Sequence, residues 1–143
     1  MPSSTQTFVV AAATAIASAA ASPTPYANFT QTCRRIELLP SRLQYNDTLT
    51  ASCRLATAPG NQTRDSSIDL NLCVGIDYQD AHLTWSIYGK YVEYCTSCSL
   101  APPAVMSCTC TTLAGVSAQS SLDLDTGIRN DGGVLSCMGG IGS

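Results

Sequence analysis

Two aspartates in this chain, at matching positions of a repeated segment, could form a pair of carboxylates for acid–base chemistry. Asp69 and Asp123 occupy the same place in two nearly identical segments, Ser66-Ser67-Ile68-Asp69-Leu70-Asn71 and Ser120-Ser121-Leu122-Asp123-Leu124-Asp125. Two carboxylates that flank a sugar bond are the catalytic groups of most glycoside hydrolases. Both aspartates sit between inward-facing apolar residues, so a structural role on the outward strand face is the stronger interpretation. His82 is the only histidine, which leaves no histidine-based triad or zinc cluster. We expect no enzymatic activity.

The two segments belong to an internal repeat. Cys53 precedes the first segment and Cys110 precedes the second at a similar distance, and a turn-rich stretch ending in apolar residues follows each. Two copies are too few for an open solenoid, so they must bury their apolar faces against each other. The sequence therefore predicts a pseudo-symmetric pair of cysteine-stapled β units, with repeat one over about residues 28–90 and repeat two over about 91–137.

Short alternating segments predict strands in both repeats. Period-two alternation of apolar and polar residues is typical of half-buried strands. It occurs at residues 29–33, 49–53, 67–70, 83–85, 91–95, 106–110 and 121–124. Residues 72–75 are predicted to form a short 3₁₀ turn, and the Asp-Gly sequence within 128–135 predicts a hairpin. No segment of ten or more residues after the N-terminal stretch has convincing helical periodicity, so the predicted fold class is all-β.

The first 21 residues are predicted to be a signal peptide. They carry no charge, and the apolar, alanine-rich run 8–21 offers small residues for cleavage near Ala19 or Ala21. The run is short for a membrane span and has no stop-transfer charges. A disordered Ala/Ser/Pro tail is the alternative. Cleavage leaves residues 22–143 as one domain.

The rest of the composition agrees with a secreted, extracellular protein. Eight cysteines are typical of an oxidised domain, and N-glycosylation sequons begin at Asn28, Asn46 and Asn61. The net charge is −3, and Arg34-Arg35 is the only basic pair, interpreted as a solvated strand face. Nothing here favours nucleic-acid binding. No later apolar segment is long enough to span a membrane, so we expect no membrane insertion.

Together these segments resemble the cyanovirin-N homology family. Motif order, repeat number and cysteine placement agree, through residues 29–33, 49–53, 66–71 and 83–85, then Cys95, Cys110, 121–125 and 130–135. The resemblance implies an intertwined fold in which each half contains parts of both repeats, with a sugar site at each end. It also implies a non-catalytic lectin for mannose-rich glycans. We expect no cofactor and no metal.

The resemblance also implies part of the disulfide pairing. One disulfide staples each repeat of the family, which corresponds here to Cys33–Cys53 and Cys95–Cys110. Four further cysteines depart from the family pattern. Cys98 and Cys108 lie just inside the second hairpin, so a second rung is expected there. Cys73 is then left with Cys137, a pair that the intertwined fold of the family would bring together.

One sugar site is implied near the chain termini. The family uses a Gln-Thr pair and the Asn of the last turn, which fall here on Gln31, Thr32 and Asn130. Arg54 follows the second cysteine. Asp131 lies one position before the family's acidic residue, and we expect it to substitute for that residue. Asn-Asp-Gly sequences also form turns without a ligand, which is the alternative for Asn130 and Asp131.

The site at the other end is expected to be degraded. The turn at residues 75–82 carries extra residues and lacks the Asn and the Asp-Gly, and Tyr94 replaces a small hydroxyl residue that the family prefers. A weak second site is expected from Asp77, Asp80, Lys90, Thr111 and Thr112. Trp85 is expected in the core rather than as a sugar platform.

A secreted lectin that binds mannose-rich glycans or glycoproteins is thus the leading hypothesis. The alternative is a secreted, disulfide-rich protein-interaction module that keeps the fold without sugar binding. The chain is expected to be a monomer or a domain-swapped dimer.

Overall fold

The described part of the chain is an all-β structure. The computed structural model describes residues 26–40, 46–56 and 61–143. The predicted signal peptide, residues 1–21, lies outside these described residues. Within them the chain forms eleven strands and four 3₁₀ helices, so the predicted fold class is confirmed. No helix in the described ranges is long and apolar enough to cross a membrane.

The order of elements is the same in both repeats. Repeat one consists of η1 (Phe29–Gln31), β1 (Cys33–Pro40), β2 (Asn46–Arg54), β3 (Thr63–Asp69), η2 (Leu70–Leu72), β4 (Val74–Ile76) and β5 (Leu83–Trp85). Repeat two consists of η3 (Tyr91–Glu93), β6 (Cys95–Ala101), β7 (Val105–Thr111), β8 (Ser117–Asp123), η4 (Leu124–Thr126), β9 (Arg129–Asp131) and β10 (Val134–Cys137), and β11 (Gly140–Ile141) follows it.

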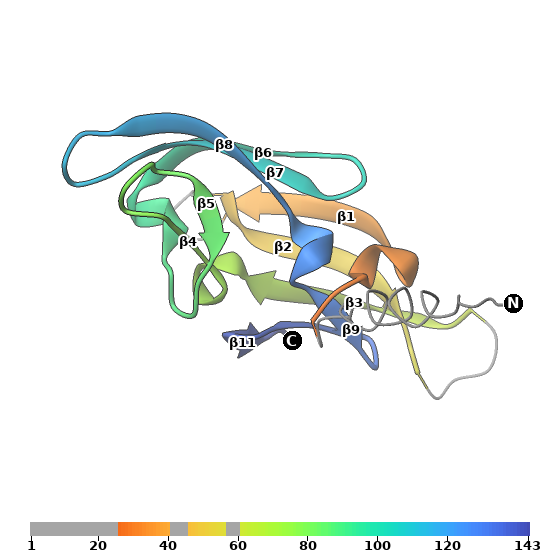
Figure 1. The fold of residues 1–143 in the computed structure, drawn as a ribbon. Helices are drawn as coiled ribbons and strands as arrows, with labels where there is room; N and C mark the ends of the chain where they lie inside the picture. The colour runs from red at the N-terminus through yellow and green to blue at the C-terminus, as the bar shows by residue number, and fades with distance from the viewer. Residues whose placement is uncertain (1–25, 41–45, 57–60) are drawn as a thin grey trace, which may run out of the picture.

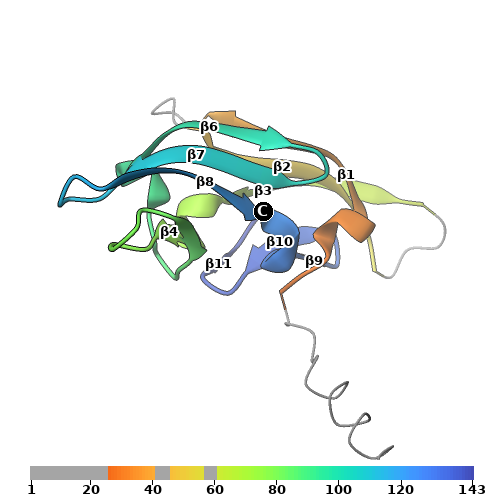
Figure 2. The same cartoon turned by 45° about the horizontal axis from the view of Figure 1, so that its top comes forward.

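Two large and two small antiparallel sheets make up the described part of the molecule (Figure 1). The large sheets have three strands each, in the order β1-β2-β3 and β6-β7-β8. The small sheets are the two-stranded β4-β5 and the three-stranded β11-β10-β9, whose strands are short. Figure 2 shows both large sheets along one side of the molecule, with β4 and the β9–β11 sheet on the other.

Each hairpin packs on the three-stranded sheet of the other repeat. The Leu135 N–H of β10 donates to the buried Ser66 hydroxyl of β3 at 2.9 Å. At the matching position, the Leu83 N–H of β5 donates to the Ser120 hydroxyl of β8, also at 2.9 Å. Each half of the molecule therefore contains parts of both repeats, as the resemblance implied.

One hydrophobic core runs through both repeats. In β2 and β3 the inward positions alternate with outward ones, as expected for strands with one buried face. The largest fully buried side chains come from both repeats: Tyr91, Phe29, Leu49, Ile68, Leu70, Met106, Leu124, Ile128, Leu135 and Val74. Burial of this area is the main stabilising contribution to folding.

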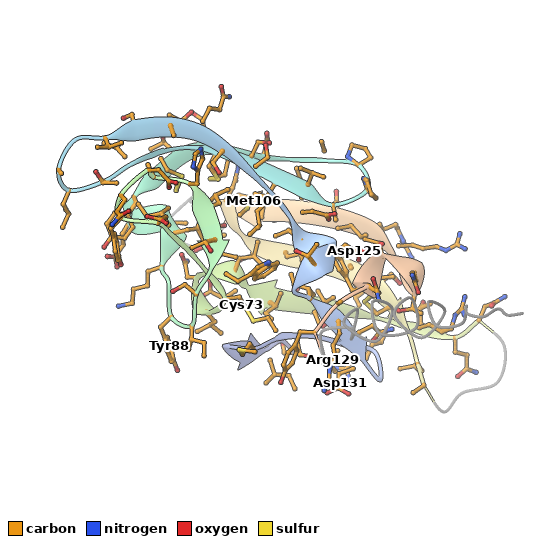
Figure 3. All side chains as sticks on the ribbon, viewed as in Figure 1. Cys73, Tyr88, Met106, Asp125, Arg129 and Asp131 are labelled. Atoms are coloured by element: carbon orange, nitrogen blue, oxygen red, sulfur yellow. A yellow bond between two sulfur atoms is a disulfide. The ribbon has the colours of Figure 1, made fainter. Side chains whose placement is uncertain are left out.

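The strands predicted at residues 29–33 and 91–95 were wrong except at their last residues. Residues 29–31 and 91–93 form 3₁₀ helices, and the strands begin only at Cys33 and Cys95. The cause is tertiary: the Asp125 carboxylate accepts from the Thr30 N–H at 2.9 Å, and the Asp125 carbonyl accepts from the Asn28 N–H at 2.8 Å (Figure 3). Such non-local bonds outweigh the local alternation, which fits a 3₁₀ turn as well as a strand.

The repeated aspartates cap the 3₁₀ helices that follow them. The Asp69 carboxylate accepts from the Asn71 N–H at 2.9 Å, and the Asp123 carboxylate accepts from the Asp125 N–H at 3.0 Å. These caps end β3 at Asp69 and start η2 at Leu70. The predicted 3₁₀ turn at 72–75 is therefore found two residues earlier. The two nearly identical hexapeptides thus encode a strand end and a helix start.

Four disulfides fasten this frame, and their pairing is the one expected from the sequence. Cys33–Cys53 joins β1 to β2, while Cys95–Cys110 and Cys98–Cys108 join β6 to β7. Cys73–Cys137 joins the two repeats across a sequence separation of 64. The structure contains no free cysteine within the described residues.

Candidate functional site

A polar hollow of about 370 Å³ lies at the end of the first sheet. It borders η1 and the facing ends of β1, β2 and β3. Its lining consists of amide, hydroxyl and guanidinium side chains, from Gln31, Thr32, Arg34, Arg35, Ser52, Arg54, Asn61 and Thr63. Among the sequence-predicted residues, Gln31, Thr32 and Arg54 therefore meet in one hollow.

A β-bulge turns two neighbouring arginines into this hollow. The register of β1 against β2 is interrupted between Arg34 and Glu37, and Arg35 has a left-handed φ of 53°. In a regular strand, successive side chains point to opposite faces. The bulge breaks that alternation, so Arg34 and Arg35 both line the hollow. Both arginines are exposed on β1, as expected for a solvated strand face, but the bulge was not expected.

Asn130 links the last hairpin to the wall of the hollow. Its side-chain Nδ2 donates to the Thr32 hydroxyl at 3.0 Å and to the Arg54 carbonyl at 2.9 Å. Its Oδ1 accepts from the Gly133 N–H at 2.7 Å. Both donors of the amide are thus used within the protein. Asn130 does not line the hollow itself; it positions Thr32, which does.

Asp131 is directed elsewhere. Its carboxylate lies 3.4 Å from the Arg129 guanidinium, two residues away on β9 (Figure 3). The same guanidinium lies 4.8 Å above the ring of Tyr26. Asp131 is not among the residues that line the polar hollow. The expectation that Asp131 replaces the family's acidic site residue has no geometric support.

The aspartates of the predicted second site are engaged within their own loop. Asp77 Oδ1 accepts from the Gln79 N–H at 2.8 Å, and Asp80 Oδ1 accepts from the His82 N–H at 2.9 Å. The hydrogen bonds from His82 hold the pKa of Asp80 below its usual value. Both carboxylates therefore stabilise turns rather than converging on a shared site.

The remaining predicted second-site residues also serve the local backbone. Lys90 adopts a left-handed conformation before η3, and its N–H donates to the Asn71 carbonyl at 3.0 Å. Thr111 shares a 2.7 Å hydrogen bond with Ser117. Thr112 is buried and accepts from the Val116 N–H at 3.1 Å.

An aromatic pair occupies the position that matches Thr32. Tyr94 precedes Cys95 as Thr32 precedes Cys33, and its ring meets Tyr78 edge-on with centroids 5.6 Å apart. A hydrogen bond with Tyr78 raises the pKa of Tyr94. The second end is therefore built differently from the first.

Trp85 is only half-buried and lines a second, apolar hollow of about 260 Å³. Its indole N–H donates to the Thr126 hydroxyl at 3.1 Å. It packs against the core, as expected, but it also contributes to a surface. Tyr26, Ile87 and Met138 complete the apolar lining.

Three solved structures share this fold. The NMR structure of GzCVNH from Gibberella zeae matches with a TM-score of 0.64 and 20% identity, covering 78% of this chain and 97% of that one. A MoCVNH3 variant solved in complex with (N-GlcNAc)4 matches with a TM-score of 0.65 and 18% identity, covering 80% of this chain and 99% of that one. Microvirin solved with mannobiose matches with a TM-score of 0.58 and 22% identity, covering 78% of this chain and 98% of that one. At these identities the likeness concerns the fold.

The sequence itself supplies the family assignment. Among proteins with curated descriptions, no similar sequence was found. The family model for the CVNH domain matches residues 29–136, which span both repeats from η1 to the end of β10. The chain therefore belongs to the cyanovirin-N homology (CVNH) family.

Proposed function

We propose that this protein is a secreted, non-catalytic lectin that binds mannose-rich glycans through the polar hollow at the end of the first sheet. Membership of the CVNH family supports sugar binding. Two proteins of the same fold were solved with sugars, the MoCVNH3 variant with (N-GlcNAc)4 and microvirin with mannobiose. The observation that carries the proposal is the hollow itself, in which Gln31, Thr32 and Arg54 meet.

The side chains of the hollow match the chemistry of a sugar. Sugar hydroxyls both donate and accept, so they need partners of both kinds. Thr32 and Thr63 offer hydroxyls, and Gln31 and Asn61 offer amides. The Ser52 hydroxyl is buried and donates to the Thr63 hydroxyl at 3.1 Å. Short hydroxyl side chains lose little entropy when a ligand fixes them.

The two aspartates considered for glycoside hydrolysis, Asp69 and Asp123, cap 3₁₀ helices instead. Asp69 and Asp123 each accept a backbone N–H at the start of a 3₁₀ helix. Each lies in a different repeat, at matching positions. The proposed activity is therefore binding without bond cleavage.

Calorimetric titration of the monomer with oligomannose tests the proposal after a glycan array has ranked the sugars. We expect one binding event per chain, because the second end is built from loop-internal contacts. Loss of all glycan signal on the array contradicts the lectin assignment. Two equal sites contradict the one-ended part of it. Release of reducing sugar from oligomannose contradicts the non-catalytic part.

The apolar hollow favours a second candidate function, a protein-interaction module. Ile87, Tyr88 and Met138 are 57%, 65% and 67% exposed, and Ile87 and Met138 border this hollow beside Trp85. Exposed apolar groups that gather in one place mark interaction sites. The substitution Met138→Lys separates the two functions: it should leave glycan binding unchanged and abolish any protein interaction that uses this surface.

A further inference from the structure

The polar hollow concentrates positive charge in an acidic protein. The chain carries a net charge of −3, yet three arginines and no carboxylate line the hollow. Among the described residues the ion pairs are His82–Asp80 and Arg129–Asp131. Arg34, Arg35 and Arg54 therefore face the hollow without an ion-pair partner in the described ranges.

The nearest carboxylates belong to a neighbouring hollow. Glu37 and Asp65 line it, and Arg35 borders both hollows. Neither carboxylate forms an ion pair with Arg35 within the described residues. Arg34 and Arg54 do not border that second hollow. Arg34 and Arg54 thus line the first hollow without a carboxylate beside them, and Arg35 stands where this hollow meets its neighbours.

The fold does not require arginines at these positions. Repeat two has the same bulge, between Thr96 and Ser99, and Ser97 has a left-handed φ of 56° where Arg35 has 53°. At the matching positions of that bulge, Thr96 and Ser97 replace the two arginines. The backbone geometry is therefore common to both repeats, and the basic side chains are particular to this hollow.

We infer that the hollow selects acidic glycans, which carry a sulfate, phosphate or carboxylate group beside their hydroxyls; the inference rests on the proposed lectin function. A guanidinium offers paired N–H donors that match two oxygens of such a group. The Thr32 hydroxyl and the Gln31 amide contact the neutral part of the sugar. An uncharged mannose chain would offer the three guanidinium groups only neutral hydroxyl acceptors, which form weaker hydrogen bonds than an anion does.

A glycan fits these side chains better than a nucleic acid does. Proteins that bind single-stranded nucleic acids stack the bases on aromatic side chains. No aromatic residue lines this hollow. Its uncharged lining instead consists of the hydroxyl and amide groups that sugar hydroxyls need.

Calorimetry with matched ligands tests the inference. The probes are neutral tetramannose, the same tetrasaccharide with a 6-O-sulfate or a 6-O-phosphate, its terminal uronate counterpart, and a short oligothymidylate. At physiological salt we expect at least one acidic form to bind about ten-fold more tightly than the neutral one, as a single charge-assisted hydrogen bond permits. The acidic form that binds most tightly identifies the anion.

Two variants assign the preference to the bulge. Arg34→Thr/Arg35→Ser installs the side chains that repeat two carries on the same backbone, and it should bring the ratio of acidic to neutral affinity close to one. Arg64→Gln is the matched control, because Arg64 lies on the same sheet outside the hollow and its stem packs near Gly133. The control should retain the ratio, and thermal melting should show that both variants fold.

The possible failures are distinguishable. Equal affinity for neutral and acidic forms overturns the inference and leaves the lectin function standing. Binding of oligothymidylate as tight as that of the acidic glycans also overturns it, because the hollow would then select anions rather than sugars. Failure of every glycan to bind overturns the lectin function together with the inference.

Discussion

The two ends of the molecule share a backbone but differ in the side chains that a ligand would meet. The Arg54 N–H donates to the Thr32 carbonyl at 2.9 Å, and the Thr111 N–H donates to the Tyr94 carbonyl at 2.9 Å. The side chains around this common frame differ between the two ends. Six positions correspond: Gln31 to Glu93, Thr32 to Tyr94, Arg34 to Thr96, Arg35 to Ser97, Arg54 to Thr111 and Thr63 to Ser117. The frame and the binding surface can therefore change independently.

The closing hairpins show the same separation. At the first end Asp131 pairs with Val134, and Gly132 and Gly133 make the turn with φ values of 63° and 101°. A two-residue turn with both φ angles positive suits glycine. At the other end the β4–β5 loop is longer and carries Tyr78, which meets Tyr94. The residue before the first cysteine of the repeat therefore lines a hollow at the first end, where it is Thr32, but meets the loop at the other end, where it is Tyr94.

The largest expected effect is on the free energy of unfolding, when the disulfides of the two ends are removed. Replacing Cys33 and Cys53 with alanine opens the disulfide-closed segment of the first end and should cost about 3 kcal/mol of stability. The same replacement of Cys95 and Cys110 should cost less, about 2 kcal/mol in that model, because Cys98–Cys108 already closes the inner part and leaves only a short outer loop to be released. Chemical denaturation of the two variants measures the difference. Equal losses would mean that strand packing, and not chain closure, sets the contribution.

A second comparison concerns the two hairpin loops. Asn130→Ala removes bonds to Thr32, Arg54 and Gly133 and should lower stability by about 1–3 kcal/mol. It should also weaken glycan binding, because Thr32 loses its support. Asp77→Ala removes a bond within an exposed loop and should cost less than about 1 kcal/mol. Thermal melting and glycan titration report the two effects separately. If Asn130→Ala melts and binds like the parent, the positioning role is refuted.

These positions also show what the sequence can and cannot reveal. Period two within residues 49–53 and 106–110 reports a buried face, so β2 and β7 could be predicted from the residues alone. Residues 29–31 alternate in the same way, yet they form η1 because Asp125 accepts the Thr30 N–H at 2.9 Å. That contact joins residues far apart in the sequence, and no local pattern encodes it.

Some residues of the candidate site could also be predicted from the sequence, and others could not. Gln31 and Thr32 could be named through the resemblance to the family, whose Gln-Thr pair falls on them. The arginine pair could not, because a bulge decides the direction of Arg34 and Arg35, and only the strand register reveals the bulge. A basic pair next to the first cysteine was the available signal. Asn130 was also named, but the sequence could not show that its amide donates to Thr32 and to the Arg54 carbonyl.

The comparison can be sharpened by transplanting one end onto the other. The set Glu93→Gln, Tyr94→Thr, Thr96→Arg, Ser97→Arg and Thr111→Arg gives repeat two the side chains of the first hollow. Arg35 already tolerates a φ of 53°, so Ser97→Arg at 56° adds no new backbone strain. Titration with the preferred glycan should move from one site per chain to two, the new one several-fold weaker because the long β4–β5 loop remains. A variant that folds but still binds one glycan would show that the hairpin, not the sheet, limits the second end.

The smallest expected effect concerns the protein's own glycosylation. Asn61 begins a sequon and lines the polar hollow, whereas Asn28 begins a sequon outside it. A glycan attached to Asn61 would compete with external ligand for the same donors. Where that glycan is present, removing it with Asn61→Gln keeps an amide and should raise the affinity two- to three-fold, which is less than about 1 kcal/mol.

Thr30→Ala is the matched control for this change. It removes the Asn28 sequon, and alanine retains the Thr30 N–H that bonds Asp125. Since Thr30 does not line the hollow, affinity should stay equal or rise less than with Asn61→Gln. Intact-mass measurement must first show that each site carries a glycan in the parent. A fall in affinity on Asn61→Gln would show instead that the Asn61 amide is itself a ligand for the bound sugar, and that the first end differs from the second by one more direct contact.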